Sequence, residues 1–238
     1  MGTCVVKLED LIVFLETENL STDAMCSFDV IEHIYDMEGF LKECKDIPGK
    51  NLRLILGSGA NERNPIIKRV LQKGHYSFEN TDRPNVFGHK QRDSLLSFLK
   101  IRWDILLAYN PKLDIESIKT LALGTRGLRK EDILACVDDF EKTGKLNYVP
   151  NHPTNTCDPL SGNWNEQLMD PLWLKSILET QGFAVRVLPG FWGDGVVLYK
   201  TGFKIMLNMM IKYSGAFALT FAPYYVIYAD RNDHQNKL

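Results

Sequence analysis

The sequence lacks the features that mark a nucleic-acid-binding or disulfide-rich protein. Its 28 Lys and Arg residues are outnumbered by 30 Asp and Glu residues, and the formal net charge is −2. A basic stripe that would attract a phosphate backbone is therefore not expected, and we expect no nucleic-acid partner. The five cysteines are odd in number and form no Cys-x-x-Cys pair, which argues against a disulfide framework or a structural zinc site.

A long uncharged apolar run is also absent. The apolar stretch 205–229 contains Lys212, Gly215 and Pro223, so we expect a helix followed by a buried strand and no stable membrane insertion. A helix that lies on a membrane surface at 203–213 is the less favoured alternative. The chain starts MGTCVVKLED, where an acidic residue comes too early for a signal peptide. A cytoplasmic, reducing location follows as the expectation.

What the sequence does contain is the pattern of an α/β protein. A length of 238 residues suits one large domain, or a core with an insertion. Residues 23–28 predict a buried strand, and Asp36 can cap a helix that ends at Pro48-Gly49. Residues 52–56 predict a second strand, closed by Gly57-Ser58-Gly59. A strand, a short helical crossover and another strand indicate a parallel sheet. The upstream run 4–8 is β-like, and the run 11–15 is ambiguous between helix and strand.

A helical pattern replaces this alternation after residue 60. The first helix opens at Pro65 and has Gly74 after it. Further helices are predicted over 92–109, from the cap residue Asp114 to Gly124, and over 131–142 with Gly144 following. Residues 145–170 have almost no periodicity, and a loop of this length is typical of a lid or a binding loop.

The α/β pattern resumes near residue 171. We predict helices over 172–180 and 204–213 and strands over 183–188 and 217–228, with Gly182 as a helix cap and Trp103 and Trp173 in the core. Residues 1–60 and 171–238 are then an α/β core, and residues 61–170 are a helical insertion or cap with the polar loop 145–170.

Four phrases of the α/β part resemble one enzyme family. They are the run Asp29-Val30-Ile31-Glu32-His33-Ile34 after the first strand, Ile47-Pro48-Gly49 before the second, LETQGFAV at 178–185, and Ala222-Pro223-Tyr224-Tyr225 in the last strand. In this order they resemble the strand 4 exit, the strand 5 and 6 entries and strand 7 of class I S-adenosylmethionine-dependent methyltransferases. The resemblance implies an incomplete Rossmann-like sheet with strands 4, 5, 6 and 7, the last antiparallel, and a large helical insertion.

One departure from the family pattern concerns the cofactor. The family has a glycine-rich turn after strand 1, whereas this chain has only Gly2 before residue 39. Relative to the family, the chain is therefore expected to be N-terminally truncated. Residues 4–8 would be a remnant of strand 2 or 3, and Glu9 or Asp10 would be the acid that meets the cofactor's ribose or adenine. We expect S-adenosylmethionine to bind weakly or not at all to this chain alone, and the strand 23–28 to have an open edge through which an oligomer could form.

The resemblance also implies site residues. Ser27, Phe28, Asp29 and Gly57 would contact the cofactor, and Asp29 and His33 would be catalytic, with His33 as a base. A second interpretation gives the DxxEH run a divalent ion with His75 or His89 as a further ligand. In a third, Glu32 and His33 only fix the following helix. We favour a site without a metal.

Acceptor recognition is expected in the insertion. Asn61 and Arg63 directly follow the second strand, and Asp158, Asn163 and Trp164 belong to the polar loop. Trp164 could stack on a planar or sugar ring while Asp158 and Asn163 form hydrogen bonds to it. The predicted function is transfer of a methyl group to a small-molecule or glycan acceptor. The alternative is a non-catalytic, truncated methyltransferase-like protein that acts as a partner or regulatory subunit of another chain.

Overall fold

The computed structural model describes residues 8–83, 95–193 and 198–231, with only the backbone for residues 198–201. The chain divides into two compact units. The first, called here the sheet unit, comprises residues 1–68 and 168–238, and the second, the helical unit, comprises residues 69–167. We predicted boundaries at 60/61 and 170/171.

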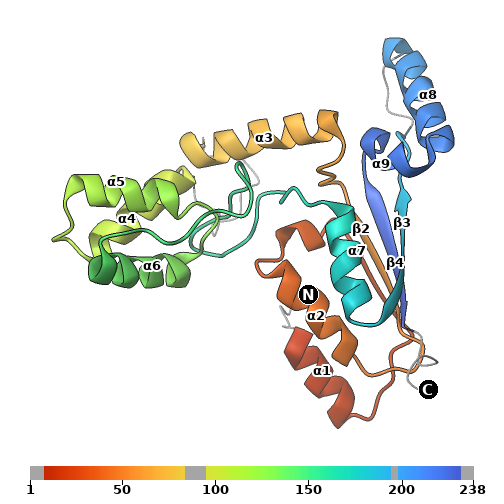
Figure 1. Ribbon diagram of the computed structural model, residues 1–238, viewed down its shortest axis with the longest axis horizontal. Helices are drawn as coiled ribbons and strands as arrows, with labels where there is room; N and C mark the ends of the chain where they lie inside the picture. The colour runs from red at the N-terminus through yellow and green to blue at the C-terminus, as the bar shows by residue number, and fades with distance from the viewer. Residues whose placement is uncertain (1–7, 84–94, 194–197, 232–238) are drawn as a thin grey trace. The chain divides into compact units, whose positions relative to one another are not determined.

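The sheet unit is built on an open, mixed sheet of four strands in the order β1-β2-β4-β3 (Figure 1). The strands are β1 (Ala24–Phe28), β2 (Arg53–Ser58), β3 (Phe183–Pro189) and β4 (Tyr225–Arg231). β1 and β2 are parallel, whereas β4 lies antiparallel between β2 and β3. The predicted α/β class and the antiparallel last strand are confirmed. Among the described residues, β1 pairs only with β2, so its other edge is open as predicted.

Helices cover one face of this sheet. They are α1 (Leu8–Thr17), α2 (Met37–Glu43) and α7 (Pro171–Thr180), which lie on the same side of the strands (Figure 1). The core between them and the strands is aliphatic, with Leu41 and Leu178 of the helices packed with Leu54 and Ile227 of the sheet. The opposite face of the strands carries exposed side chains, including Cys26 and Phe28 of β1 and Arg186 of β3. Burial on one face explains the alternating burial along β1 and β3.

Several helix ends lie where the sequence predicted them, because the groups that cap them are only a few residues away along the chain. Asp36 Oδ1 accepts a hydrogen bond of 2.8 Å from the Gly39 N–H, and Asp114 caps α5 (Ile115–Gly124) in the same way. The predicted caps at both positions are confirmed. Gly144 follows α6 (Lys130–Thr143) with a φ of +68°, a left-handed conformation that favours glycine.

The predicted strand over 217–228 is only half right. Residues Gly215–Phe217 form a single 3₁₀ turn and Ala218–Phe221 form the short helix α9, so the strand starts at Tyr225. Ala218, Leu219 and Ala222 are buried at helical spacing, and the backbone becomes extended at Ala222 because Pro223 follows. A longer helix, α8 (Leu198–Tyr213), precedes this turn.

Other sequence predictions for the sheet unit need correction. The ambiguous run 11–15 lies within the helix α1, and residue 8 is the first of that helix, whereas residues 4–7 lie outside the described part. Trp173 is 42% exposed, so its predicted place in the core is wrong.

The helical unit contains α4 (Phe98–Tyr109), α5, α6 and most of α3 (Pro65–Asn80). Its core is formed by Ile105 and Leu106 of α4, Leu121 of α5 and Val137 of α6. The predicted end of α3 at Gly74 is wrong. The helix continues because Phe78 packs against this core and Glu79 pairs with the fully buried Arg102, contacts that outweigh the low helix propensity of glycine.

The remaining predictions for the helical unit concern α4 and the loop. α4 begins at Phe98 instead of residue 92, and residues 84–94 lie outside the described part. Residues 145–170 contain no helix and no strand beyond isolated bridges, as the sequence predicted. A buried network fixes this loop, since Thr156 Oγ1 donates to Glu79 Oε2 at 2.7 Å and Glu79 pairs with Arg102.

Candidate functional site at the exits of β1 and β2

The candidate site lies where two neighbouring parallel strands end. Phe28 pairs with Gly57 in the register of β1 and β2, and the N–H of Asp29 donates a 3.0 Å hydrogen bond to the Gly57 carbonyl. Residues 27–29 and 57–59 therefore leave the sheet side by side. The carboxyl ends of parallel strands are where open α/β sheets bind ligands. The four predicted cofactor residues, Ser27, Phe28, Asp29 and Gly57, are brought together at this edge.

Asp29 adopts an uncommon backbone conformation. Its φ is +52°, in the left-handed region that Asp tolerates better than most side chains. Conformations of this kind cluster at binding and catalytic sites, because the surrounding structure must hold them. A Cβ built on Gly59 would lie 3.9 Å from Asp29 Oδ1, so the carboxylate extends over the exit of β2. A charged acceptor group is thus displayed beside the end of two strands.

Gly57 allows the ring of Phe28 to lie against the backbone of β2. A Cβ at Gly57 would come within 2.5 Å of Phe28 Cδ1, so a larger residue would push the ring away. Phe28 is 58% exposed despite this contact. An exposed aromatic ring next to a glycine offers a flat surface on which a planar ligand group can stack.

Ser27 points to the other side of β1. Its hydroxyl is buried, and among the described residues it has no hydrogen-bond partner. Since side chains alternate along a strand, Ser27 lies on the helix-covered face with Met25, whereas Phe28 lies on the open face. Ser27 and Phe28 therefore cannot present their side chains to one ligand from the same face.

The Glu32–His33 pair lies in a 3₁₀ turn, Ile31–His33, directly after the site. Ile31 is fully buried in the sheet-unit core and Glu32 is 1% exposed, so the turn is anchored by its own side chains. His33 is half-buried, and its N–H donates to the Val30 carbonyl at 2.9 Å. The burial of Glu32 agrees with the interpretation in which this residue fixes the start of α2.

The residues proposed as further metal ligands belong to the helical unit. His75 is buried, with Nε2 3.0 Å from the Glu166 carbonyl and Nδ1 3.5 Å from Thr154 Oγ1. Both ring nitrogens therefore have protein partners, and burial lowers the pKa of the imidazole. His89 lies outside the described residues. No feature of His75 supports a role as a metal ligand.

Asn61 has a structural role that the sequence did not reveal. It is fully buried, and its Nδ2 donates at 2.9 Å to the carbonyls of Leu219 and Ala222. Its Oδ1 accepts from the Arg63 N–H at 3.1 Å. Asn64, which follows the same strand and was expected near the acceptor as well, also donates to the Ala222 carbonyl. Both amide hydrogens of Asn61 are donated to backbone carbonyls of the protein, so its side-chain nitrogen has no hydrogen left to donate to a bound substrate.

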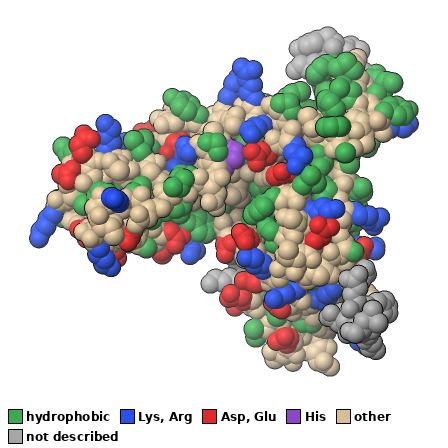
Figure 2. Space-filling model, in the orientation of Figure 1, with side chains coloured by type: hydrophobic (Ala, Val, Ile, Leu, Met, Phe, Trp, Pro, Cys, Tyr) green, Lys and Arg blue, Asp and Glu red, His purple; other side chains and the backbone are tan. Residues whose placement is uncertain are grey.

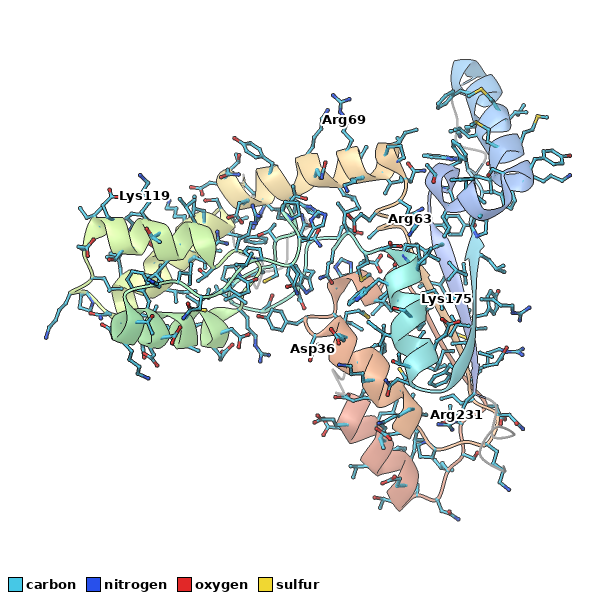
Figure 3. The ribbon with its side chains drawn as sticks, viewed as in Figure 1. Asp36, Arg63, Arg69, Lys119, Lys175 and Arg231 are labelled. Atoms are coloured by element: carbon cyan, nitrogen blue, oxygen red, sulfur yellow. The ribbon has the colours of Figure 1, made fainter. Side chains whose placement is uncertain are left out.

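Arg63, which is labelled in Figure 3, forms a bidentate pair with Asp170, the N-cap residue of α7. Its Nε and Nη2 donate to the two carboxylate oxygens at 2.7 and 2.9 Å. Burial alone would raise the pKa of Asp170, yet the hydrogen bonds from Arg63 and from the Leu172 N–H lower it. Arg63, which we predicted to contact a substrate, thus links the segment that follows β2 to the N-terminus of α7.

The loop residues of the helical unit form a turn. The Asp158 N–H donates to the Asn163 carbonyl at 2.9 Å, and Asp158 Oδ1 accepts from the Leu160 N–H at 2.8 Å. Trp164 packs closely over Gly127, where a Cβ would lie 2.9 Å from the indole ring. Asn163 is exposed. The hydrogen bonds of Asp158 thus shape the turn, and of the three predicted loop residues only Asn163 is exposed, whereas Asp158 and Trp164 are partly buried.

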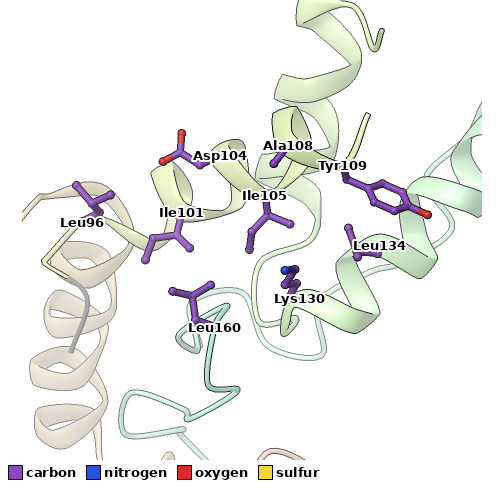
Figure 4. A pocket seen from close by; sticks show the side chains of 9 residues that line it. All are labelled: Leu96, Ile101, Asp104, Ile105, Ala108, Tyr109, Lys130, Leu134 and Leu160. Carbon is purple, nitrogen blue, oxygen red and sulfur yellow. The ribbon is translucent and has the colours of Figure 1, made fainter. Parts of the chain in front are cut away.

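The helical unit also contains a pocket that the sequence did not predict. Its volume is about 470 Å³, within the range that holds small ligands (Figure 4). Aliphatic side chains such as Ile101, Ile105 and Leu134 line it, and Asp104 and Lys130 add polar groups. None of the predicted acceptor residues lines this pocket. In the sequence, the apolar residues of α4 lie on more than one side of the helix. This pattern could have indicated the pocket, because such a helix presents apolar side chains both to the core and to a second surface.

No family model, curated protein or solved structure matches the chain. None of the helices that the structure describes is long and apolar enough to cross a membrane.

Proposed function

We propose that this chain carries the strand 4 to strand 7 half of a class I S-adenosylmethionine-dependent methyltransferase, and that its acceptor is a small molecule or a glycan. The observation that carries the proposal is the pairing of β1 with β2. This pairing brings the exit of the DxxEH phrase and the Gly57-Ser58-Gly59 turn to one edge of the sheet, where the resemblance requires them. The antiparallel β4 adds support.

The residues at this edge fit a nucleoside-containing cofactor in two respects. The exposed Phe28 ring, one face of which lies on the backbone of Gly57, provides a stacking surface on its other face. The Asp29 carboxylate can accept hydrogen bonds from hydroxyl or ammonium groups. S-adenosylmethionine would supply an electrophilic methyl group, so the protein's task is to position the acceptor in line with it.

His33 is the proposed base. It follows Asp29 by four residues and is half-buried, so it can take a proton from an acceptor that approaches the edge. Asp29 acts by holding and orienting the ligand, since its left-handed backbone fixes the direction of its carboxylate. No step of this scheme needs a metal ion.

Mapping of ligand contacts by NMR tests the proposal even when binding is weak. We expect titration with S-adenosylhomocysteine to shift the amide resonances of 28–30 and 57–59 in a saturable manner. Asp29→Asn, which keeps a residue that tolerates the left-handed backbone, should weaken binding several-fold. Asp23→Asn, at the other end of β1, should not. Shifts that map elsewhere, or none at about 5 mM ligand, would contradict the cofactor site.

The edge of β1 that has no strand partner among the described residues favours a second candidate function, that of a partner subunit. Backbone groups on a free edge readily pair with a strand of another chain. In this case, the chain completes or regulates a catalytic chain and does not bind the cofactor itself. The NMR titration separates the two candidates, because a non-catalytic partner should show no saturable shifts at Asp29 or Gly57.

A further inference from the structure

Helix α8 has two apolar sides, of which the protein uses one. Leu207 and Ile211 are buried, and Ile211 packs with Ala218, Ala222 and Trp192. Asn208 fixes this side by two hydrogen bonds with the backbone of Trp192, of 2.9 and 3.1 Å. The orientation of α8 about its own axis is therefore set by specific contacts.

The remaining side of α8 is apolar and exposed. Its large side chains are between 37% and 72% exposed. We call this set the α8 apolar face; it comprises Phe203, Ile205, Met206, Met209, Met210 and Tyr213. At 100° per residue these positions form one continuous arc of about 160°, separate from the arc of Leu207 and Ile211. In Figure 2 the same region appears as a dense group of hydrophobic side chains.

The area of this face is unusual for a protein surface. The six side chains together expose on the order of 600 Å² of largely apolar surface, at the upper limit for the largest patch on a typical monomer. Phe217, in the turn after α8, is 72% exposed and extends the apolar region. Exposed surfaces of this size mark interaction sites.

The charge pattern indicates what this surface binds. The chain has 30 acidic residues, yet none lies between Asp194 and Asp230. Lysines do occur there, and Lys212 is exposed at the border of the α8 apolar face. An apolar helical face with aromatic and methionine side chains, flanked by lysine and free of acids, is complementary to an anionic lipid surface. An apolar groove on a protein partner could also cover this face. Binding to such a groove would not, however, explain why the surrounding sequence contains no acidic residues.

We propose that the α8 apolar face docks on the surface of an anionic lipid bilayer, with the helix parallel to the membrane plane. The aromatic and methionine side chains enter the headgroup boundary, while Lys212 remains at the level of the anionic headgroups. The proposal is independent of the cofactor site and of methyl transfer, since it rests on α8 alone.

Flotation of the full chain with phosphatidylcholine vesicles, with and without phosphatidylglycerol, tests this docking. We expect binding to the anionic vesicles that falls at least tenfold in the double variant Met206→Glu and Met210→Glu. These side chains are exposed, so the variant should fold, which circular dichroism checks. The matched control places the same charges on α5, as Ile115→Glu and Leu123→Glu, and should bind like the wild type.

The electrostatic part has its own test. Lys212→Gln should lower binding to anionic vesicles about fivefold, whereas Lys119→Gln on α5 should not. Absence of binding to anionic vesicles, or binding that both glutamate variants retain equally, would overturn the proposal. Self-association in sedimentation velocity that only the Met206 and Met210 substitutions abolish, without vesicle binding, would assign the face to a second copy of the chain instead.

Discussion

Asn61 illustrates how much one buried side chain can contribute at the residue scale. Replacement by Ala removes three side-chain hydrogen bonds and leaves the carbonyls of Leu219 and Ala222 with fewer donors in a buried place. We expect Asn61→Ala to lower the free energy of unfolding by about 2–4 kcal/mol, measured by urea denaturation. Asn51→Ala, at an exposed turn of the same unit, is the control and should change it by less than about 0.5 kcal/mol. Equal effects would show that the α9 contact is not stabilising.

His75 gives the helical unit a pH dependence. Burial lowers the pKa of His75 below its ordinary value of about 6.5, so the unfolded chain takes up the proton first as the pH falls. Stability is thus retained above that value and lost as the pH falls from it towards the folded-state pKa. We expect wild type to lose more stability than His75→Gln between pH 7.5 and 5.5, measured by urea denaturation. Parallel losses in both proteins would assign the effect to other groups.

The element scale shows which parts of the fold the sequence could reveal. Caps at Asp36 and Asp114 were predictable because their hydrogen bonds span three residues, and the strands β1 and β3 because their apolar runs are local. The continuation of α3 past Gly74 was not, because Arg102 and the α4–α6 core, which hold it, are distant in sequence. The start of β4 was missed because α9 is held by Asn61 and Asn64, some 160 residues upstream.

Two glycines test this account of the elements. Gly74 lies within α3, and a Cβ there would meet nothing within 4 Å. Gly74→Ala should therefore raise the free energy of unfolding by about 0.5–1 kcal/mol, since alanine has the higher helix propensity. A loss of stability would mean that α3 ends where the sequence suggested.

Gly49 provides the opposite case. Its φ is +153°, and a Cβ there would lie 2.1 Å from the Thr22 carbonyl oxygen. Because the obstacle is backbone, which cannot swing away as a side chain can, Gly49→Ala should destabilise the sheet unit by more than about 2 kcal/mol. The thermal midpoints of the two alanine variants, compared with wild type, should move in opposite directions.

The candidate site shows the same division between local and distant causes. The position of Asp29 beside Gly57 followed from two adjacent strand exits, and the parallel pairing brings them together. The structural roles of Asn61 and Arg63 could not be read from the sequence, because their partners are carbonyls of α9 and the carboxylate of Asp170. Polar residues after a strand are ambiguous for this reason, since anchoring a distant element and binding a ligand require the same chemical groups.

At the scale of the whole molecule, two features decide how a cofactor would be held. Only one glycine, Gly2, precedes residue 39, so the chain has no glycine-rich turn before β1. The described part of the chain also leaves one edge of β1 and one face of the sheet open. In the family that the chain resembles, that turn supplies backbone donors to the amino-acid part of S-adenosylmethionine. A cofactor site formed by this chain alone would lack those backbone donors.

We accordingly expect this chain alone to bind S-adenosylmethionine or S-adenosylhomocysteine only at millimolar concentrations. Loss of about three hydrogen bonds at roughly 0.5–1.5 kcal/mol each removes about 2–4 kcal/mol of binding free energy. This corresponds to a factor of about 30 to 1000, which turns a micromolar affinity into a millimolar one. Isothermal titration calorimetry of the purified chain measures it. A dissociation constant of about 10 μM or tighter would show that other residues of this chain complete the site, and would contradict the argument from the missing turn.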